Sequence, residues 1–416
     1  MNAAVILNAF QDDEVRRITM RRPFILAPLL ALIACGTAPA DGQASAQSVA
    51  AGQAPITGDR PFAPPPFAAS EIARFDDPWA MTFLPDGQML VTEKAGRMWL
   101  VSGDGRRRTA VGGMPRVNPR GQGALGEVVL HPQFAANSLV YFSYSAAGSL
   151  NAITLARGRL SGDLDHGARL DGMTILYRAH PPIDGGQYGG RIAFAPDGHL
   201  FFSTGERQHF MPAQDRDGTL GKILRLNDDG TPAAGNPLAA QGFDPAVWSY
   251  GHRNPLGLAF DAAGALWEDE MGPRGGDELN LILPGRNYGW PIVSNGDNYD
   301  GTPIPDHSTR PDLEPPRASW NPSISPSSLL IYSGALFPAW RGKALIGALS
   351  GEALLLVRIT GGTAQEEARY DMRARIRALA QGPDGALYLL EDGSSARLLR
   401  LTPRQAPRSW SIEPDS

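Results

Sequence analysis

The chain has 416 residues, with 38 Lys and Arg against 43 Asp and Glu and a formal net charge of −5. This length suits one large domain or two medium ones. Because the chain has no basic stripe and no aromatic RNA-binding motif, nucleic acid is not an expected partner. Gly (48) and Pro (36) are frequent and only 19% of the residues are charged, which favours many short strands joined by turns over a helical protein.

An export signal is expected near the N-terminus. The stretch MRRPFILAPLLALIACG, which begins at Met20, places two arginines before an apolar run that is too short to span a bilayer comfortably. Its LIAC tetrapeptide resembles a bacterial lipobox, so Cys35 is the expected site of lipidation; a plain signal peptide cut a few residues later is the alternative. We therefore expect residues 20–35 to be the signal peptide, and residues 1–19 to precede the natural start.

A flexible tether is expected to follow the signal. Residues 36–65 are rich in Ala, Gln, Gly and Pro, a composition that does not support a packed core. Cys35 has no second cysteine with which to form a disulfide. We therefore expect a periplasmic protein that is anchored to the outer membrane by a lipid and has no other contact with the membrane.

A repeated phrase then organises the chain from residue 66 to 404. Each copy has an apolar strand, a tight turn with Gly or Asn, and a second apolar or alternating strand. The clearest copies are MTFLPDGQMLVT (81–92), IAFAPDGHLFFST (192–204), LAFDAAGALWE (258–268) and LAQGPDGALYLL (379–390), and looser ones begin at Val128 and Leu336. These copies predict an all-β fold, a six-bladed β-propeller with loop insertions, followed by a tail at 405–416. A pair of β-sandwiches with coincidental hairpins is the alternative.

Three loops beside these strands are unusually polar or rich in glycine. GGQYGGRIAF (185–194) contains four glycines, which allow backbone to approach a neighbour or a ligand closely. WSYGHRNPLGLAF (248–260) places an Arg-Asn pair before a strand, and EMGPRGGDELNLILPGRNYGWP (270–291) follows the same hairpin. Each could be an ordinary solvated turn. In a propeller, however, loops of one face converge on the axis, so we expect them to meet at one mouth.

Several phrases carry a resemblance to a known family. They are GQGALGEVVLHPQF, QYGGRIAFAPDGHLFFSTGE, AQDRDGTLGKILRLNDDGT, WSYGHRNPLGLAF, MGPRGGDELNLILPGRNYGWP and RIRALAQGPDG, which occur in order between about Trp79 and Pro403. On these phrases the chain resembles the soluble aldose sugar dehydrogenases of the glucose/sorbosone dehydrogenase family, which depend on pyrroloquinoline quinone (PQQ). The resemblance implies oxidation of an aldose at C1 to the lactone, with PQQ and Ca²⁺ over the axis and an unidentified electron acceptor.

The resemblance also implies the site residues. Gln122 and Tyr299 match cofactor contacts, Arg253 and Asn254 match a pair that contacts the quinone and the substrate, and Arg375 and Arg377 match arginines that face the PQQ carboxylates. Such a pocket needs fixed cations, and Arg offers bidentate geometry. Without the resemblance, the last two arginines could equally pair with acidic neighbours on an edge strand.

Calcium ligands are implied in the same way. Gly272 and Pro273 match the carbonyls that hold the cofactor's Ca²⁺, and Glu278 and Tyr288 match ligands of a second, structural Ca²⁺. Calcium takes six to eight oxygen ligands, many of which can be backbone carbonyls of Gly- and Pro-containing turns.

The family pattern breaks at two positions. The family's general-base histidine lies four residues before the position of Arg191, where this chain has Gln187. An imidazole accepts a hydroxyl proton near neutral pH, whereas a carboxamide can only orient a hydroxyl or a water. His209 could instead move over the mouth of the propeller and serve as the base, whereas His252 is expected to have a structural role. At Ser350, close relatives carry a lysine directed at the cofactor.

Three functions therefore compete. The first is a dehydrogenase that turns over through a substituted base or works slowly. The second is an exported binding protein that keeps the pocket and has lost turnover, and that binds a sugar, a glycan or a quinone-like ligand. The third is a Ca²⁺-dependent lactone hydrolase, which needs carboxylate and Asn ligands spread around the axis. Asp269, Glu270, Asp277 and Glu278 lie too close together in one segment to indicate that arrangement.

Overall fold

The structure is a computed structural model that describes residues 56–148 and 151–404. The expected signal peptide, Cys35 and the tail at 405–416 lie outside these residues. The described part is dominated by strands, and its α-helix α1 has only four residues, Phe134–Asn137. Short 3-10 turns lie at η1 (Met211–Ala213), η2 (Ala239–Gln241), η3 (His307–Thr309) and η4 (Pro338–Trp340). The prediction of an all-β fold is confirmed. No helix within these residues is long and apolar enough to cross a membrane.

The strands fall into sets of four, in which each strand pairs with the next. The first set is β3 (Pro78–Phe83), β4 (Met89–Glu93), β5 (Arg97–Val101) and β6 (Arg108–Gly112), and the second is β7 (Leu125–Leu130), β8 (Leu139–Ser145), β9 (Ile153–Asp163) and β10 (Gly167–Arg178). The third is β11 (Gly189–Phe194), β12 (Leu200–Thr204), β13 (Lys222–Leu226) and β14 (Val247–Tyr250), and the fourth is β15 (Pro255–Phe260), β16 (Leu266–Glu270), β18 (Asp277–Ile282) and β20 (Ala318–Trp320). The fifth is β21 (Pro326–Ile331), β22 (Ala344–Ala348), β23 (Ala353–Thr360) and β24 (Thr363–Asp371), and the last is β25 (Ile376–Gln381), β26 (Leu387–Glu391), β27 (Ala396–Pro403) and β2 (Phe67–Phe75).

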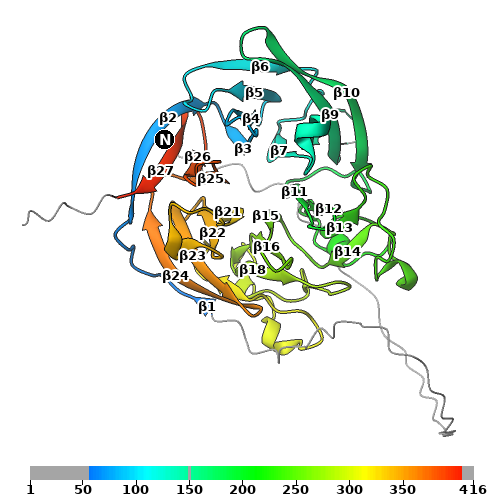
Figure 1. The fold of residues 1–416 in the computed structure, drawn as a ribbon. Coiled ribbons are helices and arrows are strands. Elements are labelled where there is room, and N and C mark those ends of the chain that lie inside the picture. Colours follow the sequence, from blue (N-terminus) through cyan, green and yellow to red (C-terminus); the bar gives the residue numbers. More distant parts are fainter. Residues whose placement is uncertain (1–55, 149–150, 405–416) are drawn as a thin grey trace, which may run out of the picture. The chain divides into compact units, whose positions relative to one another are not determined.

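The first strand of each set packs against the first strand of the next. The contacts run from β3 to β7, β11, β15, β21 and β25, and β25 packs against β3. Figure 1 shows these strands around a common centre, with the other strands of each set outside them. The first two sets are also joined by a short parallel pairing of β6 with β10. This propeller-like arrangement brings strand ends from every set to one central region.

The last set combines strands from the two ends of the propeller-like region. The early strand β2 pairs antiparallel with β27 and so completes the sheet that the C-terminal strands begin. A further strand, β1 (Ile56–Thr57), pairs in parallel with β20. The Ala63 N–H donates to the Arg369 carbonyl at 2.8 Å. Ile56, Thr57 and Ala63, which fall within the expected tether at 36–65, are thus hydrogen-bonded to the sheets.

The repeated phrases form hairpins between the first two strands of a set. The turn glycines Gly87, Gly198, Gly264 and Gly385 have φ values of 86°, 90°, 82° and 80°, which is the left-handed region that favours glycine. The two looser copies differ from the prediction. The copy from Val128 turns through helix α1, and the copy from Leu336 begins in a loop with η4, because its first strand, β21, lies earlier in the chain.

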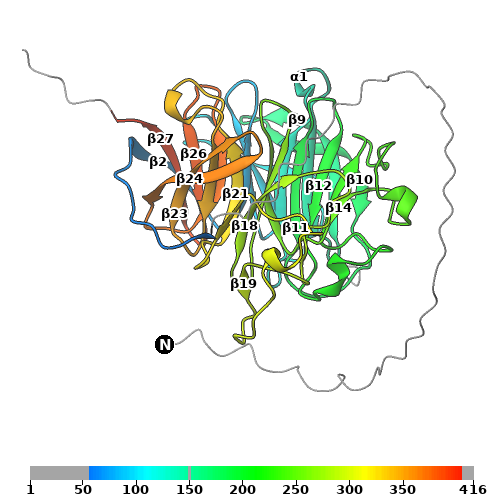
Figure 2. The ribbon, with the colours of Figure 1, turned by 90° about the horizontal axis from the view of Figure 1, so that it is seen from below.

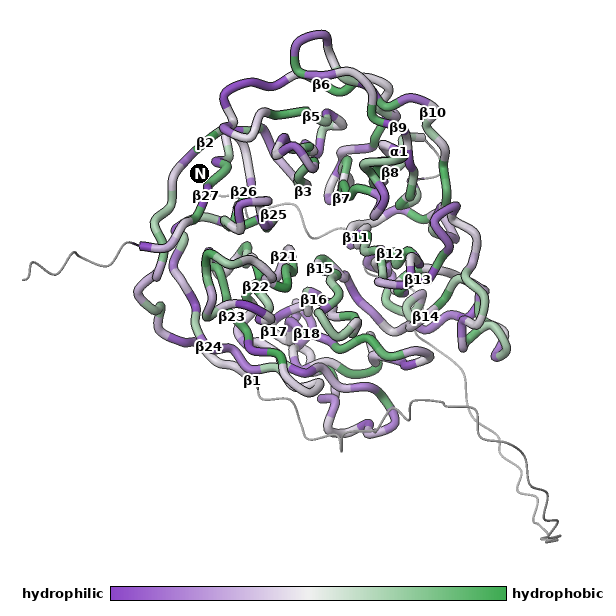
Figure 3. The backbone as a smooth tube through the Cα atoms, viewed as in Figure 1, coloured by the Kyte–Doolittle hydropathy of each residue, from purple (hydrophilic) through white to green (hydrophobic). Residues whose placement is uncertain are grey.

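Apolar side chains fill the space between neighbouring sets. Leu90 and Leu100 pack with Phe142 of the second set, and Trp267 packs with Ile346 of the fifth. Figure 3 shows hydrophobic residues along many of the strands and hydrophilic residues in many of the outer turns. A long insertion after β18 contains β19 (Gly296–Asp297), which pairs with β17 (Arg274–Gly275). In Figure 2 this insertion projects from one face of the sheets.

Candidate active site

A cavity of about 280 Å³ lies between the inner strands. Its walls come from several sets, because each set contributes the end of an inner strand or the loop beside it. The lining includes Trp79, Lys94, Gln122, Tyr188, Asn254, Met271, Ser325, Leu349, Arg375 and Arg377. Four of the residues predicted to bind a cofactor are thus brought together, although more than 250 positions separate Gln122 from Arg377 in the sequence.

Three cations that line the cavity share one carboxylate, Asp392. It accepts hydrogen bonds from Lys94 Nζ at 3.0 Å, Arg375 Nε at 2.9 Å and Arg377 Nε at 2.9 Å. Burial would raise the pKa of Asp392, but the charges of Arg377 and Lys94 outweigh it and hold that pKa well below its usual range. Asp392 is therefore ionised, and this wall keeps a surplus of positive charge that suits a ligand with several carboxylates.

Arg375 and Arg377 pair with an acidic neighbour, as the alternative interpretation expected, and both also line the cavity. Ser350, the position at which a lysine was expected, places its hydroxyl 2.7 Å from that of Ser325. The third cation comes instead from Lys94, which the sequence analysis did not single out.

Gln187 lies beside the cavity, between a carboxylate and a guanidinium. Its backbone N–H donates to Gln122 Oε1 at 2.7 Å, and its φ of 48° is left-handed. With its amide oriented to satisfy both neighbours, Nε2 donates to Glu206 and Oε1 accepts from Arg253 Nη2 at 2.6 Å. Gln187 is 4% exposed and Glu206 is 1% exposed. Burial raises the pKa of Glu206, although the Phe210 N–H and Arg253 oppose the shift. The expected position of the general base thus holds a neutral amide backed by a buried carboxylate.

The glycines before Gln187 let two loops pack closely. A Cβ at Gly185 would overlap the carbonyl of Arg207, and a Cβ at Gly186 would lie 2.9 Å from the side-chain amide of Gln122. Any larger residue would push these loops apart and would move Gln187 away from its partners.

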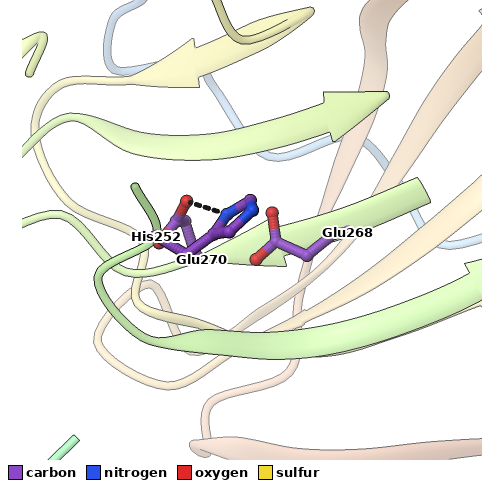
Figure 4. A group of neighbouring side chains, drawn as sticks. All are labelled: His252, Glu268 and Glu270. Atoms are coloured by element: carbon purple, nitrogen blue, oxygen red, sulfur yellow. Dashed lines mark hydrogen bonds and ion pairs between the residues drawn. The ribbon is translucent and has the colours of Figure 1, made fainter. Parts of the chain in front are cut away.

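Glu270 fixes the backbone of the Arg253–Asn254 pair. Its Oε2 accepts from the Arg253 N–H at 2.5 Å and from the Asn254 N–H at 3.1 Å, and its Oε1 lies 3.2 Å from His252 Nδ1. Figure 4 shows His252 and Glu270 in contact, with Glu268 beside them; ligand atoms of all three lie within 4.8 Å of one another. Because backbone donors and His252 occupy both oxygens of Glu270, the Glu270 carboxylate holds the backbone at Arg253 and Asn254 in place. His252 is held structurally, as expected.

In the turn that is predicted to bind the cofactor's calcium, the carbonyl oxygens contact the positively charged guanidinium of Arg253. The Arg253 Nη1 donates to the carbonyls of Met271 and Gly272, each at 2.9 Å. Pro273 is buried in the same turn. Carbonyl oxygens therefore converge where a positive charge sits, which fits the hard oxygen ligands of Ca²⁺. A calcium ion bound to the Gly272 carbonyl would compete with the Arg253 guanidinium for that oxygen.

A second, small cavity of about 10 Å³ adjoins this turn. Its lining includes Arg253, Glu270, Met271, Gly272, Glu278 and Tyr288. This volume is close to that of one bound water or ion. The Glu278 carboxylate faces His307 Nε2 and Asn280 Nδ2, each at 3.2 Å. An ion-sized space beside a carboxylate and a carbonyl-rich turn fits the predicted structural Ca²⁺.

Arg253 and Tyr299 are not placed quite as expected. The guanidinium of Arg253 lines the small cavity, and it is separated from the large one by Met271, which lines both. Tyr299 is 70% exposed, and its hydroxyl accepts from Arg253 Nη2 at 3.2 Å. Tyr299 is therefore linked to the small cavity through the guanidinium of Arg253. His209 Nε2 lies 2.9 Å from the Asp184 carbonyl, which ties this side chain to the loop before Gln187.

Lys94, Glu206 and Asp392 are the site residues that the sequence analysis missed. A common signal was present: each follows the second strand of a repeat copy by one or two residues, after β4, β12 and β26. Aligning the copies on that strand would have selected these three positions, since the same strand ends face the centre in each set.

Together, the fold and the site define a propeller-like protein with a cationic central cavity suited to a polyanionic cofactor. Comparison with known proteins agrees with this class. The family model for glucose/sorbosone dehydrogenase matches residues 75–400. The chain belongs to the glucose/sorbosone dehydrogenase family.

Individual relatives cover most of the chain. Aldose sugar dehydrogenase YliI of Escherichia coli (strain K12) is 38% identical over 341 residues, which cover 80% of this chain and 91% of the relative. The crystal structure of the soluble aldose sugar dehydrogenase from Escherichia coli in the apo-form superimposes with a TM-score of 0.76 at 36% identity, covering 81% of this chain and all of that one. The PQQ-bound form of aldose sugar dehydrogenase from Streptomyces coelicolor gives a TM-score of 0.67 at 31% identity, over 82% and 99% of the chains.

Proposed function

We propose that the protein oxidises an aldose at C1 to the lactone, using PQQ and Ca²⁺, and that its sets of four strands are the blades of a six-bladed propeller. The observation that carries this proposal is the cavity wall in which Lys94, Arg375 and Arg377 share the single carboxylate of Asp392. PQQ is a tricarboxylate, and cations that survive desolvation are what such a ligand requires. The PQQ-bound relative supports the same cofactor.

Different residues of the chain would bind the cofactor and contact the sugar. Lys94, Arg375 and Arg377 would hold the cofactor carboxylates, and Gln122 and Asn254 would contact its polar edge. When bound, PQQ would supply the oxidant for loss of a hydride from C1, and the hydroxyl proton, which the Gln187 amide does not take, would pass to solvent water. Arg253, whose backbone is fixed by Glu270, would place its guanidinium next to the sugar hydroxyl and polarise it.

Gln187 is the point on which turnover depends. Its amide orients a hydroxyl but does not accept a proton near neutral pH, and its side chain is already engaged by Glu206 and Arg253. We therefore propose slow turnover, because the base position has kept its neighbours and lost its titratable group. The second candidate, a binding protein without turnover, is favoured by the same observation.

The predicted location and partners remain proposals. The lipobox-like LIAC sequence supports attachment of Cys35 to the outer membrane on its periplasmic side, and a dehydrogenase there needs an electron acceptor of unknown identity. Gly272, Pro273, Glu278 and Tyr288 would hold the Ca²⁺ ions. A lactone hydrolase has less support, because the buried acidic residues of β16 and β18 are gathered in one set and not spread around the axis.

Reconstitution tests the proposal. The purified protein is loaded with PQQ and Ca²⁺, and dye reduction is followed over a panel of aldoses for the wild type, for Gln187→His and for Gln133→His, a control on the exposed turn before α1. Slow wild-type turnover that rises only in Gln187→His supports the proposed enzyme. PQQ binding without turnover in the wild type supports the binding protein, and failure to bind PQQ overturns the proposed function.

A further inference from the structure

Three buried carboxylates gather inside the fourth set of strands. Glu268 and Glu270 lie on β16, Glu278 lies on β18, and all three side chains are buried. An oxygen of each lies 3.0, 3.4 and 3.2 Å, respectively, from one nitrogen, Asn280 Nδ2. Because an amide nitrogen carries two hydrogens, it cannot donate a full hydrogen bond to three carboxylates at once.

The negative charge of this group is balanced only in part. Within the described residues, Glu270 pairs with His252 and Glu278 pairs with His307, each at 3.2 Å, and no lysine or arginine forms an ion pair with any of the three carboxylates. Glu268 has no cationic partner in that part of the chain, although it is fully buried. A buried carboxylate without a partner is strongly unfavourable, so Glu268 needs either a proton or a bound cation.

Two oxygen atoms in this group have no hydrogen-bond partner among the described residues. They are Glu268 Oε1 and Asn280 Oδ1, and both side chains are fully buried. Leaving a buried acceptor unpaired costs free energy, and neither oxygen carries a hydrogen of its own. A cation is therefore the kind of group that would satisfy both atoms.

His252 adds a nitrogen ligand to these oxygens. Ligand atoms of His252, Glu268 and Glu270 all lie within 4.8 Å of one another, and Figure 4 shows the carboxyl group of Glu268 beside the His252 ring. His252 Nε2 lies 2.9 Å from Ser249 Oγ, and the ring stacks on Tyr288 with centroids 4.6 Å apart. One ring nitrogen is thus held by a neighbour, which is how proteins commonly orient a histidine whose other nitrogen binds a metal.

This group is separate from the predicted Ca²⁺ sites. The small cavity that fits the structural Ca²⁺ is lined by Glu270 and Glu278 but not by His252 or Glu268. Calcium takes oxygen ligands, whereas a mixed set of imidazole and carboxylate ligands is typical of Zn²⁺ and other divalent transition metals.

We propose that His252, Glu268 and Glu270 bind a divalent transition metal ion such as Zn²⁺, with the Asn280 amide oxygen as a further ligand. The metal would take the place of the contact between His252 Nδ1 and Glu270 Oε1, and it would neutralise Glu268. The other oxygen of Glu270 accepts the backbone N–H groups of the Arg253–Asn254 pair, so the metal would hold that backbone from inside the sheet. Its role is structural and does not depend on the oxidation of a sugar.

Metal binding tests the site directly. The purified, untagged protein is freed of metals with a chelator and is then kept in excess Ca²⁺, so that sites made of oxygen ligands are filled. Co²⁺ is the probe, because its visible absorption reports ligation by protein nitrogen and oxygen, and Zn²⁺ is added to displace it. We expect the wild type to bind one Co²⁺ per chain, to develop a visible absorption band and to melt at a higher Tm.

Variants locate the metal. Glu268→Gln should weaken Co²⁺ binding at least about 10-fold. Glu366→Gln is the matched control, because Glu366 is also a buried carboxylate and pairs with Arg369 in the fifth set, so it should bind Co²⁺ as the wild type does.

A second variant keeps the test independent of how well Glu268→Gln folds. Glu268→Leu removes the buried carboxyl group, so we expect it to melt at least as high as the metal-free wild type and to gain no stability from Co²⁺. Absence of Co²⁺ uptake by the wild type would overturn the site and would mean that a proton neutralises Glu268. A Co²⁺-dependent rise in Tm that is equal in the wild type and Glu268→Leu would overturn it as well.

Discussion

The side chain of Gln187 fills a space whose walls would suit a histidine. Glu206 provides a buried carboxylate on one side and Arg253 a guanidinium on the other. A carboxylate behind an imidazole orients the ring and raises its basicity, an arrangement that many enzymes use. At the expected position of the general base, the chain thus carries an amide between a buried carboxylate and a guanidinium.

The substitution Gln187→His should therefore create a working base. We expect kcat of the reconstituted protein to rise about 10²–10⁴-fold, the range that general-base catalysis contributes. The pH profile should show the ionisation of the new histidine, which Glu206 raises and which Arg253 and burial lower. In the double variant Gln187→His/Glu206→Gln, that ionisation should move down by a measurable amount. An unchanged profile would show that Glu206 does not act on residue 187.

Lys94 carries a second prediction, about cofactor affinity. It contributes one of the three cations of the cavity wall, and losing one charged hydrogen bond costs about 1.5–3 kcal/mol. We expect Lys94→Met to weaken PQQ binding about 10–100-fold in a spectroscopic titration. Lys343→Met is the control, because Lys343, just before β22, pairs with Glu367 on the outer strand β24, away from the cavity lining. Equal affinities of the two variants would remove Lys94 from the site.

Asp269 makes stability depend on pH. It is fully buried on β16, and neither of its oxygens accepts a hydrogen bond from a described residue. Burial raises its pKa to about 8, against the opposing charge of Arg191. A carboxyl group whose pKa is higher in the folded state stabilises the fold below its unfolded pKa near 4. That contribution is lost as the pH rises to about 8.

The variant Asp269→Asn keeps the shape of the side chain and removes its titration. We expect its Tm to fall less between pH 5 and pH 8.5 than that of the wild type, whereas Asp86→Asn, at an exposed turn, should follow the wild type. Parallel Tm curves for all three proteins would contradict a raised pKa at Asp269.

Among the elements, the hairpins were predictable from sequence and the site was predictable only in part. A Gly turn between two apolar strands is a local signal, so Gly87 or Gly198 is sufficient to place a hairpin. The pairing of Lys94 with Asp392 joins residues 298 positions apart, and no local pattern specifies it. Gln122, Arg375 and Arg377 were found through family resemblance, which records such long-range contacts indirectly.

The loop between β12 and β13 gives an element-scale prediction. Lys222 begins β13, and its Nζ donates to the carbonyls of Pro212, Ala213 and Leu220 at 2.7, 3.0 and 2.8 Å. Burial lowers its pKa to about 7. Lys222→Met would leave three carbonyls without this donor, so we expect the Tm to fall by roughly 3–10 °C. Limited proteolysis should cut near Met211 faster than in the Lys343→Met control; equal cleavage would mean that other contacts hold the loop.

At the scale of the whole described fold, one arginine ties the inner strands together beside the cavity. Arg191 on β11 donates to Glu127 Oε2 on β7 at 2.6 Å, to the Leu256 carbonyl on β15 at 2.5 Å and to the Ser327 carbonyl on β21. Its guanidinium also lies 4.1 Å from the Trp79 ring on β3. The same central packing that positions the site therefore depends on contacts between sets, so the site and the closure of the ring of sheets are coupled.

That closure depends on the pairing of β2 with β27, which joins an early strand of the described chain to the C-terminal set. Phe67 also packs edge-to-face on Trp340 and Tyr370, with centroids 6.1 and 5.4 Å away. A shortened chain that begins at Asp77 loses this strand. One that begins at Pro66 keeps it and loses β1 with its two pairs with β20, together with the bonds from Arg60 and Ala63 to β24. We expect the first truncation to lower the Tm by at least about 10 °C and the second by a few degrees.

A synthetic peptide with the sequence of residues 66–76 should restore part of the lost stability, because it can pair with the exposed edge of β27. PQQ affinity should fall with the first truncation and recover with the peptide, since the cavity residues Arg375 and Arg377 belong to the same set as β27. If the chain that begins at Asp77 melts at the same temperature as the one that begins at Pro66, the ring of sheets is closed by packing of the inner strands alone.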